Sequence, residues 1–252
     1  MKKIFLYILA GSLCFSACKK DNDEEEVYQE PEDVAVQNDY DNQSIQKFMN
    51  DNYLDAQGNI KAFSSSDTSD DNEKKLSQLN PITLSSGVIY IVRPGAQPVD
   101  IDPTTPGTPI AAKDVIRVMM KSKTYVAANT NGNVAFASSV DFFNTIDGTG
   151  SPAVDPMYYY VKEKVLTNAS TDAAKQRSYY EIEGFQEALQ KFKAFNLDNG
   201  AAYNLQGVII VPSRAAFARD AHYNYTGYSF RNRTFVFNFQ VYKTETRPAD
   251  QY

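Results

Sequence analysis

One amphipathic segment constrains the fold most, because it needs a sheet on which to bury its apolar side. Phe185, Leu189 and Phe192 stand at positions i, i+4 and i+7, and polar residues lie between them. This spacing places three large side chains on one face and predicts a helix over residues 184–195. The preceding residues 179–182 favour β structure, so we interpret the glycine that opens the segment as a hinge.

Two strands that follow this helix define the sheet. Residues 207–211 form a continuous apolar run before Pro212, which predicts a strand buried on both faces. Residues 234–242 alternate instead, with amides at one parity. The apolar members share the other parity: Phe235, Phe237, Phe239 and Val241. Alternation with period two predicts one face on the core and one in solvent, as in an antiparallel sheet.

Earlier segments supply the remaining strands, and the packed domain is expected to start near Ile82. The expected pieces are strands at 87–93 and 114–120, an extension at 124–128, a turn at 131–133 and a return strand at 134–139. With one helix beside them, these strands predict an α+β domain: a twisted antiparallel sheet wrapped around a single short helix.

Composition narrows the functional classes. The 252 residues are 42% hydrophobic and 13% aromatic, which is enough to fill a core and favours a sheet. The net charge is −6, and lysines and arginines are scattered along the chain. Nucleic-acid binding is therefore not expected, because a cationic stripe that would neutralise phosphates is missing from the sequence.

The N-terminus has the pattern of an export signal. Basic residues at 2–3 precede a short apolar run at 4–15, and Phe-Ser-Ala-Cys follows at 15–18. This resembles a bacterial lipoprotein signal, which implies that residues 1–18 hold the signal peptide and that Cys18 is lipidated. The apolar run is shorter than the roughly 20 residues that a membrane span needs. We therefore expect a lipid-anchored protein of the cell envelope, periplasmic or surface-exposed, in the outer membrane.

An acidic stretch follows the anchor. Residues 19–43 are rich in charge and amide side chains, which predicts a disordered tether. They also resemble the surface-export signal of Bacteroidetes lipoproteins, although a plain solvated spacer explains them equally. Over residues 44–80 we expect a short amphipathic helix and then a linker. The helix is expected from the spacing of Ile45, Phe48, Met49 and Leu54.

Three blocks in order resemble the C-terminal half of an FKBP-type peptidyl-prolyl isomerase domain. They read Ile-x-Gly-Phe-x-x-Ala-Leu at 182–189, Val-Pro-Ser-x-x-Ala-Phe at 211–217 and Thr-Phe-Val-Phe-x-Phe-x-Val at 234–241. A shorter match earlier in the chain includes Gly132, Phe136, Ser138 and Ser139. The resemblance implies an FKBP-like domain over residues 81–248, with an insertion at about 140–178 that the family pattern does not have.

The resemblance also implies a kind of chemistry. Rotation about an X-Pro bond has a barrier of about 18–20 kcal/mol, and an apolar pocket that holds the twisted amide lowers it without a nucleophile, metal or cofactor. The implied catalytic residues are Phe136, Ile182, Phe185, Phe217 and Phe237, with Ile182 acting through its backbone N–H. The implied further pocket residues are Met120, Ala137 and Glu181.

Those matched positions depart from the family in their polar groups. Ala137 stands where aspartate is usual, and Phe217 lacks the hydroxyl of the usual tyrosine. Met120 replaces an aromatic residue, and Glu181 replaces an apolar one. Each missing donor or acceptor costs orientation, about 1–2 kcal/mol if it acted in the transition state.

Three functions remain open. The first is a membrane-anchored prolyl isomerase that assists the folding of exported, proline-containing proteins. The second is a catalytically weak or inactive FKBP-like binding or chaperone lipoprotein. The third is an unrelated β-rich lipoprotein whose phenylalanines are ordinary core residues. With His222 as the one histidine, expected in an exposed loop, and a single mature cysteine, zinc and Ser/Cys hydrolase sites are not expected.

Overall fold

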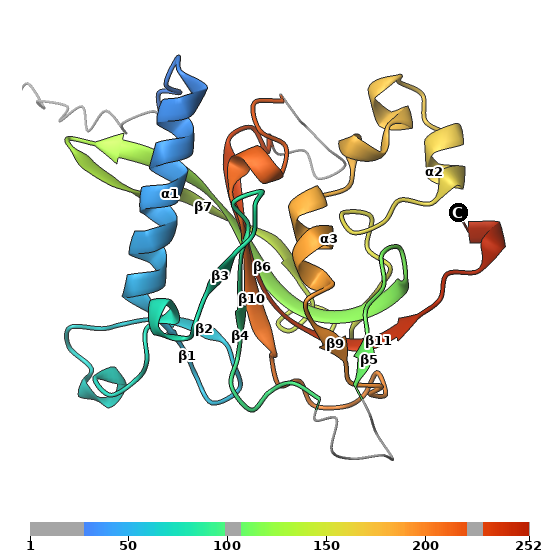
Figure 1. Cartoon of the computed structure of the whole chain (residues 1–252), viewed down its shortest axis with the longest axis horizontal. Coiled ribbons are helices and arrows are strands. Elements are labelled where there is room, and N and C mark those ends of the chain that lie inside the picture. Colours follow the sequence, from blue (N-terminus) through green and yellow to red (C-terminus); the bar gives the residue numbers. More distant parts are fainter. Residues whose placement is uncertain (1–27, 99–106, 221–228, 252) are drawn as a thin grey trace, which may run out of the picture.

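The computed structural model describes residues 28–98, 107–220 and 229–251, so Cys18 and His222 lie outside the described residues. Its centre is a sheet in the order β3-β4-β10-β11-β6-β7, and β8 also pairs with β6 (Figure 1). The strands are β3 (Ile82–Thr83), β4 (Ile89–Val92), β6 (Val115–Thr130), β7 (Asn133–Asn144), β8 (Ala153–Val154), β10 (Gly207–Val211) and β11 (Arg233–Glu245). Every pairing in this sheet is antiparallel.

Smaller elements surround the sheet. Two short antiparallel pairs join β1 (Asn52–Leu54) to β2 (Ile60–Ala62) and β5 (Thr108–Pro109) to β9 (Lys193–Ala194). The α-helices are α1 (Val34–Asp51), α2 (Glu163–Thr167) and α3 (Glu183–Leu189). Single 3₁₀ turns are η1 (Thr68–Asp70), η2 (Leu76–Gln78), η3 (Ala173–Lys175), η4 (Arg177–Tyr179), η5 (Ser213–Ala215) and η6 (Ala249–Gln251). The antiparallel sheet with few helices is the α+β class that the sequence predicts.

The sheet is buried on both faces. Figure 1 shows α1 on one side of it and α3 on the other. The α3 side holds Phe185, Ile209 and Phe237 in one core cluster, whereas the α1 side holds Ile45, Met49 and Val236 in a second. The prediction that β10 is a fully buried strand over 207–211 is confirmed, because all five of its residues are buried.

The central strand β11 differs from its prediction. The face that carries Asn238 was expected to lie in solvent, but Asn238 is 3% exposed. Its Nδ2 donates to the carbonyl oxygens of Gly58 (2.9 Å) and Gly207 (3.2 Å), and its Oδ1 accepts from the N–H of Ile60 (3.2 Å). The N-terminal segment thus supplies partners for the buried amide, so alternation of polar residues did not mean exposure here.

Helix α1 replaces much of the expected tether. It begins at Val34, and the side chain of Asp33 accepts a hydrogen bond from the N–H of Ala35 (2.8 Å), as an N-cap does. The prediction of disorder was wrong for residues 34–43. These polar residues belong to a packed face, since Gln37 and Asp41 are almost fully buried against the sheet. The helix ends at Asp51, and none of the helices in the described residues combines the length and apolarity needed to cross a membrane.

Strands β6 and β7 form one long hairpin. The two expected pieces at 114–120 and 124–128 are a single strand, and the turn after it places Asn131 (φ 54°) and Gly132 (φ 86°) in the left-handed region. Two such residues form the tight turn that matches the twist of a hairpin. Strand β7 continues to Asn144, so the first residues of the predicted insertion belong to the sheet.

Gly184 packs directly on the sheet, and this close approach accounts for the residue better than the hinge that the sequence suggested. A Cβ at this position would lie 2.6 Å from Cγ1 of Val211, 2.7 Å from Cγ2 of Val88 and 2.9 Å from the carbonyl oxygen of Ala215. Helix α3 therefore approaches β10 as closely as it does only because residue 184 has no side chain.

We expect Gly184→Ala to destabilise the protein although alanine is the better helix former. Propensity alone favours alanine by about 1 kcal/mol, whereas overpacking a core contact costs about 1–3 kcal/mol. Urea unfolding followed by circular dichroism would measure the change. Gly200→Ala is the control, because nothing lies within 4 Å of a Cβ built there. An unchanged or higher midpoint for Gly184→Ala would contradict the close approach.

Candidate functional site

Rings from the sheet and from α3 meet in a packed group on the α3 side. The ring centroids of Phe185 and Phe237 are 4.4 Å apart, and those of Phe217 and Phe235 are 5.9 Å apart. We call this group the aromatic cluster. Its members are Phe142, Tyr158, Phe185, Phe217, Phe230, Phe235 and Phe237.

The three blocks that resemble an FKBP domain fall on adjacent elements. Ile182 is the N-cap residue of α3, so Phe185 lies in the first turn of the helix against the sheet. Strand β10 ends before Pro212, and η5 then leads to Phe217. Phe237 lies on β11, which pairs with β10. Local structure therefore brings together residues that are distant in the sequence.

Five of the predicted site residues share this core, and they are packed inside it. Their exposed fractions are at most 5%: Met120, Ile182, Phe185, Phe217 and Phe237. Side chains this deeply buried do not line a wide hollow. The aromatic cluster is therefore filled by the protein's own side chains.

Tyr158, from the insertion after β7, closes the aromatic cluster. It is 2% exposed, and its ring centroid lies 5.6 Å from that of Phe185 and 5.9 Å from that of Phe237. Its hydroxyl lies 3.1 Å from Sδ of Met120. Its carbonyl oxygen accepts a hydrogen bond from the N–H of Ile182 at 2.8 Å. The resemblance reserves this donor for a ligand carbonyl, and in this chain an internal carbonyl occupies it.

Phe136 lies elsewhere, on the α1 side of the sheet. Its ring stacks on Tyr125, with centroids 4.9 Å apart, and meets Phe48 of α1 at 5.8 Å. Between Phe136 and Phe143, β7 carries two register shifts against β6 and a left-handed residue, Ser138 (φ 48°), so Phe136 and Phe142 take opposite faces although they are an even number of residues apart. An extra residue in a strand reverses which face the following side chains take.

Phe142 takes the place in the aromatic cluster that the sequence assigned to Phe136. Its ring lies 5.0 Å from that of Phe235 and 5.2 Å from that of Tyr158, centroid to centroid. Both Phe142 and Tyr158 belong to the segment that the family pattern did not cover. The only sequence signal for them is their aromatic character, which is also that of many core residues. Ala137 is exposed on β7 and is not part of the cluster.

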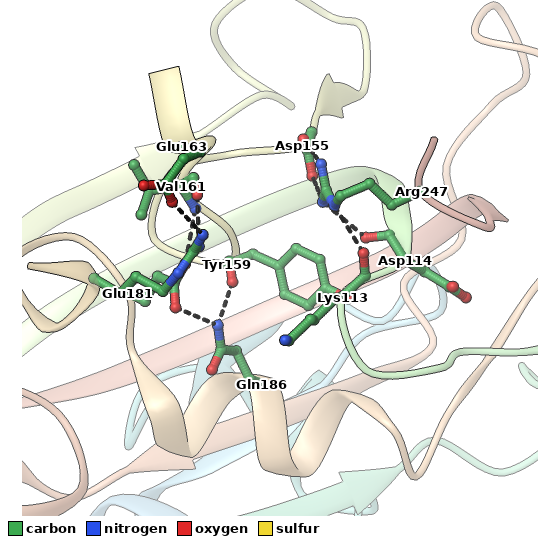
Figure 2. Close-up of polar contacts among 10 residues, drawn as sticks. Lys113, Asp114, Asp155, Tyr159, Val161, Glu163, Glu181, Gln186 and Arg247 are labelled. Atoms are coloured by element: carbon green, nitrogen blue, oxygen red, sulfur yellow. Dashed lines mark hydrogen bonds and ion pairs between the residues drawn. The ribbon is translucent and has the colours of Figure 1, made fainter. Parts of the chain in front are cut away.

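Glu181 belongs to a polar network beside the cluster (Figure 2). Its Oε1 accepts from the N–H of Val161 (2.9 Å) and from Nη1 of Arg177 (3.0 Å), and its Oε2 accepts from Nε2 of Gln186 (3.1 Å). Gln186 also donates to the carbonyl oxygen of Tyr159 (2.5 Å). A carboxylate that is satisfied in this way ties the insertion to the start of α3.

A buried ion pair holds the other end of the insertion, also drawn in Figure 2. Arg247 and Asp155 have side chains 0% and 4% exposed, and two hydrogen bonds of 2.6 and 2.5 Å join them. The guanidinium further donates to the carbonyl oxygens of Lys113 and Asp114 and lies 3.6 Å from the ring centroid of Tyr160. Burial raises the pKa of the neighbouring Tyr159 phenol. The insertion is thus anchored on both sides of Tyr158.

The comparisons with known proteins include a distant likeness to a solved structure. No family model and no curated protein matches this chain. Among solved structures, the crystal structure of FkpA from Escherichia coli is similar with a TM-score of 0.35 and 18% identity. The match covers 67% of this chain and 53% of FkpA, so this chain spans about half the length of that protein. No group of three or more His, Cys, Asp or Glu that could hold a metal occurs in residues 28–98, 107–220 and 229–251.

A buried carboxylate joins α1 to the loop that carries Phe217. Asp41 is fully buried, and its Oδ2 accepts from the N–H (2.9 Å) and the Oγ (2.6 Å) of Ser213. Its Oδ1 accepts from Nε2 of Gln37 (3.1 Å). Burial raises the pKa of Asp41, although the hydrogen bonds from Ser213 and Gln37 act in the opposite direction.

We expect Asp41→Ala to cost about 2–4 kcal/mol of unfolding free energy, because it leaves the buried donors of Ser213 without an acceptor. Asp41→Asn keeps the shape and removes the charge, so it should cost less. Chemical unfolding of both variants at neutral pH would measure the difference. Equal losses for the two variants would show that the acceptor matters less than the charge.

The raised pKa also predicts a pH dependence with a definite sign. An acid that binds its proton more tightly in the folded state favours folding most when protonated, and that advantage is lost as the pH rises through its folded pKa. The unfolding free energy of the wild type relative to Asp41→Asn should therefore fall as the pH rises above about 4, the pKa of an unperturbed aspartate. A relative stability that rises with pH over this range would refute the shift.

Proposed function

We propose that this chain is a lipid-anchored, FKBP-like polypeptide-binding protein of the bacterial cell envelope, whose proline site is held closed by its own Tyr158. One observation carries the proposal. The carbonyl oxygen of Tyr158 accepts the Ile182 N–H while its ring packs on Phe185 and Phe237. The residue thus makes the two contacts, one apolar and one hydrogen-bonded, that the family resemblance assigns to a bound proline segment.

The closed arrangement lowers the affinity of the site for a proline segment. Moving the ring of Tyr158 into water costs about 2–3 kcal/mol, and loss of the hydrogen bond to Ile182 adds about 1 kcal/mol. A cost of 3–4 kcal/mol leaves the open form at roughly one molecule in 10² to 10³, and it lowers the apparent affinity for a proline segment by that factor. Binding to unfolded clients is then transient, and isomerase activity in the intact chain is weak.

Prolyl isomerisation itself is the second candidate. The observation that favours it is the assembly of Phe185, Phe217 and Phe237 with Ile182 in one cluster. An open form of this cluster would present an apolar, aromatic surface of the kind that disfavours a planar, solvated amide. The two candidates share a site and differ in whether Tyr158 leaves it often enough for turnover.

Tyr158→Ala should separate the two candidates. We expect the wild type at micromolar concentration to give little acceleration of a proline-limited refolding reaction. Tyr158→Ala removes the ring but keeps the backbone carbonyl that accepts the Ile182 N–H, so it should bind a proline-containing peptide roughly 10²-fold more tightly. Isothermal titration would measure the affinity, and the refolding rate would measure the activity. Phe185→Ala in the Tyr158→Ala background should remove both gains. Tyr203→Ala, which removes a partly exposed tyrosine outside the cluster, is the control.

The outcomes differ clearly. Strong acceleration by the wild type that is lost in Phe185→Ala would favour the isomerase. A failure of the wild type and of a well-folded Tyr158→Ala variant to bind proline peptides or unfolded protein would end the FKBP-like proposal. A thermal melt of each variant distinguishes loss of the site from loss of the fold.

The anchor is a separate proposal. If Cys18 carries the lipid, Cys18→Ser should move the protein from the membrane fraction to the aqueous fraction of the producing cells, and labelling with a radioactive fatty acid should disappear. A single acyl chain binds membranes only marginally, so stable anchoring requires the multiply acylated cysteine that the signal implies. Unchanged fractionation of Cys18→Ser would refute the anchor and leave the binding proposal in place.

A further inference from the structure

A cleft opens on the α1 side of the sheet, remote from the aromatic cluster. It has a volume of about 200 Å³ and lies between the C-terminal half of α1, strand β2 and strands β6 and β11. Its apolar lining comes from Phe48, Ile60, Tyr125 and Val236, and its charged lining from Lys121 and Lys123. The volume is below the about 300 Å³ at which sites for drug-sized ligands begin, so the cleft suits a small molecule.

Aromatic rings form one wall of the cleft. The ring centroids of Phe48 and Tyr125 are 5.6 Å apart, at an interplanar angle of 55°. Tyr125 is held from behind by Phe136, stacked at 4.9 Å and 20°. Three rings that fix one another in this way present a preformed surface, against which a flat aromatic ligand makes favourable offset or edge contacts.

The floor of the cleft offers a ligand no polar partner. The side chain of Asn238 lies there, and both of its ends are already used by Gly58, Gly207 and Ile60, as described above. The other amide of the lining, the half-buried Asn52, donates its Nδ2 to the carbonyl oxygen of Phe48 (2.7 Å). Val236, the other floor residue, is apolar and 3% exposed. A ligand would therefore direct an apolar body inward, since a polar group placed there would lose its hydrogen bonds to water.

The rim carries the charge. Lys121 and Lys123 lie two positions apart on β6 and so project from the same face of the strand. Each pairs with an exposed aspartate, Lys121 with Asp147 (2.5 Å) and Lys123 with Asp141 (2.7 Å). The aspartates are 58% and 66% exposed, and pairs of this kind contribute little, so an incoming anion displaces them at small cost.

We propose that this cleft is a binding site for a small aromatic carboxylate, with the ring system against the wall formed by Phe48 and Tyr125 and the carboxylate at Lys121 and Lys123. The combination decides the class of ligand: an aromatic wall, a floor without a polar partner, and two ammonium groups at the mouth. A neutral aromatic molecule would contact only the apolar part of the cleft. An anion without a ring would interact only with the two lysines at the rim.

The test uses 2-naphthoate as the probe and neutral 2-naphthamide as its isostere. Both are titrated into the protein under low salt, and amide chemical shifts and calorimetry follow binding. We expect naphthoate to bind with shifts centred on β6 and the end of α1, and naphthamide to bind about two- to five-fold more weakly. The double variant Lys121→Gln/Lys123→Gln should lose this preference, and added salt should weaken naphthoate binding in the wild type.

A matched control is available on α2 and its N-cap. Lys162 and Lys164 are two positions apart and exposed, so Lys162→Gln/Lys164→Gln removes the same charge at a site outside the cleft. This control should bind naphthoate like the wild type. Equal affinity for the two probes, full retention of binding in Lys121→Gln/Lys123→Gln, or shifts confined to the aromatic cluster would each overturn the proposal. A thermal melt confirms that the variants are folded.

Discussion

The central strand β11 is buried on both faces, and most of the architecture follows from this constraint. One face carries phenylalanines that pack beneath α3, whereas the other carries Val236, Asn238 and Gln240. Amides at buried positions need partners, and the chain supplies them from distant backbone: Gly58 and Ile60 for Asn238, and the N–H of Asn204 for Gln240 (2.7 Å). The N-terminal segment is therefore part of the domain and completes its core.

The same reasoning applies on the α3 side. Residues 140–178, which the family pattern does not have, place Tyr158 in the core that also holds Phe217, a residue without the hydroxyl of the tyrosine usual at its matched position. In the closed site that we propose, the anchors at Glu181 and at Arg247–Asp155 hold the segment that carries Tyr158 in place.

The sequence predicted the elements whose signals are local. The apolar run of β10 and the Asn-Gly turn between β6 and β7 each depend on neighbouring residues, and the structure confirms them. The helix predicted over 184–195 is confirmed only as far as Leu189, and Phe192 packs in the core from beyond its end. Prediction from the sequence failed where contacts between residues far apart in the chain determine the burial of a side chain. Asp41 and Gln37 read as solvated because their partners, Ser213 and the carbonyl oxygen of Ala127, are 172 and 90 residues away.

The candidate site shows the same division. Phe185 and Phe237 could be placed because each lies within a regular element that its neighbours specify. Phe136 could not, because an irregularity near Ser138 changes the face of the strand, and no alternation pattern in the sequence signals it. Tyr158 could not because it belongs to a segment without a regular pattern.

The extent of α1 also changes what a lipid anchor at Cys18 would allow. Contacts to the domain already begin near Tyr28, whose hydroxyl lies 2.5 Å from Oε1 of Gln37, and at Glu30, which pairs with Arg231 at 2.5 Å. Residues 19–27 are then the whole link between the lipid and the first described residues. Nine residues span at most about 30 Å, whereas the 25 residues of the expected tether would span about 85 Å. With that anchor, the first described residues would lie within about 30 Å of the membrane surface.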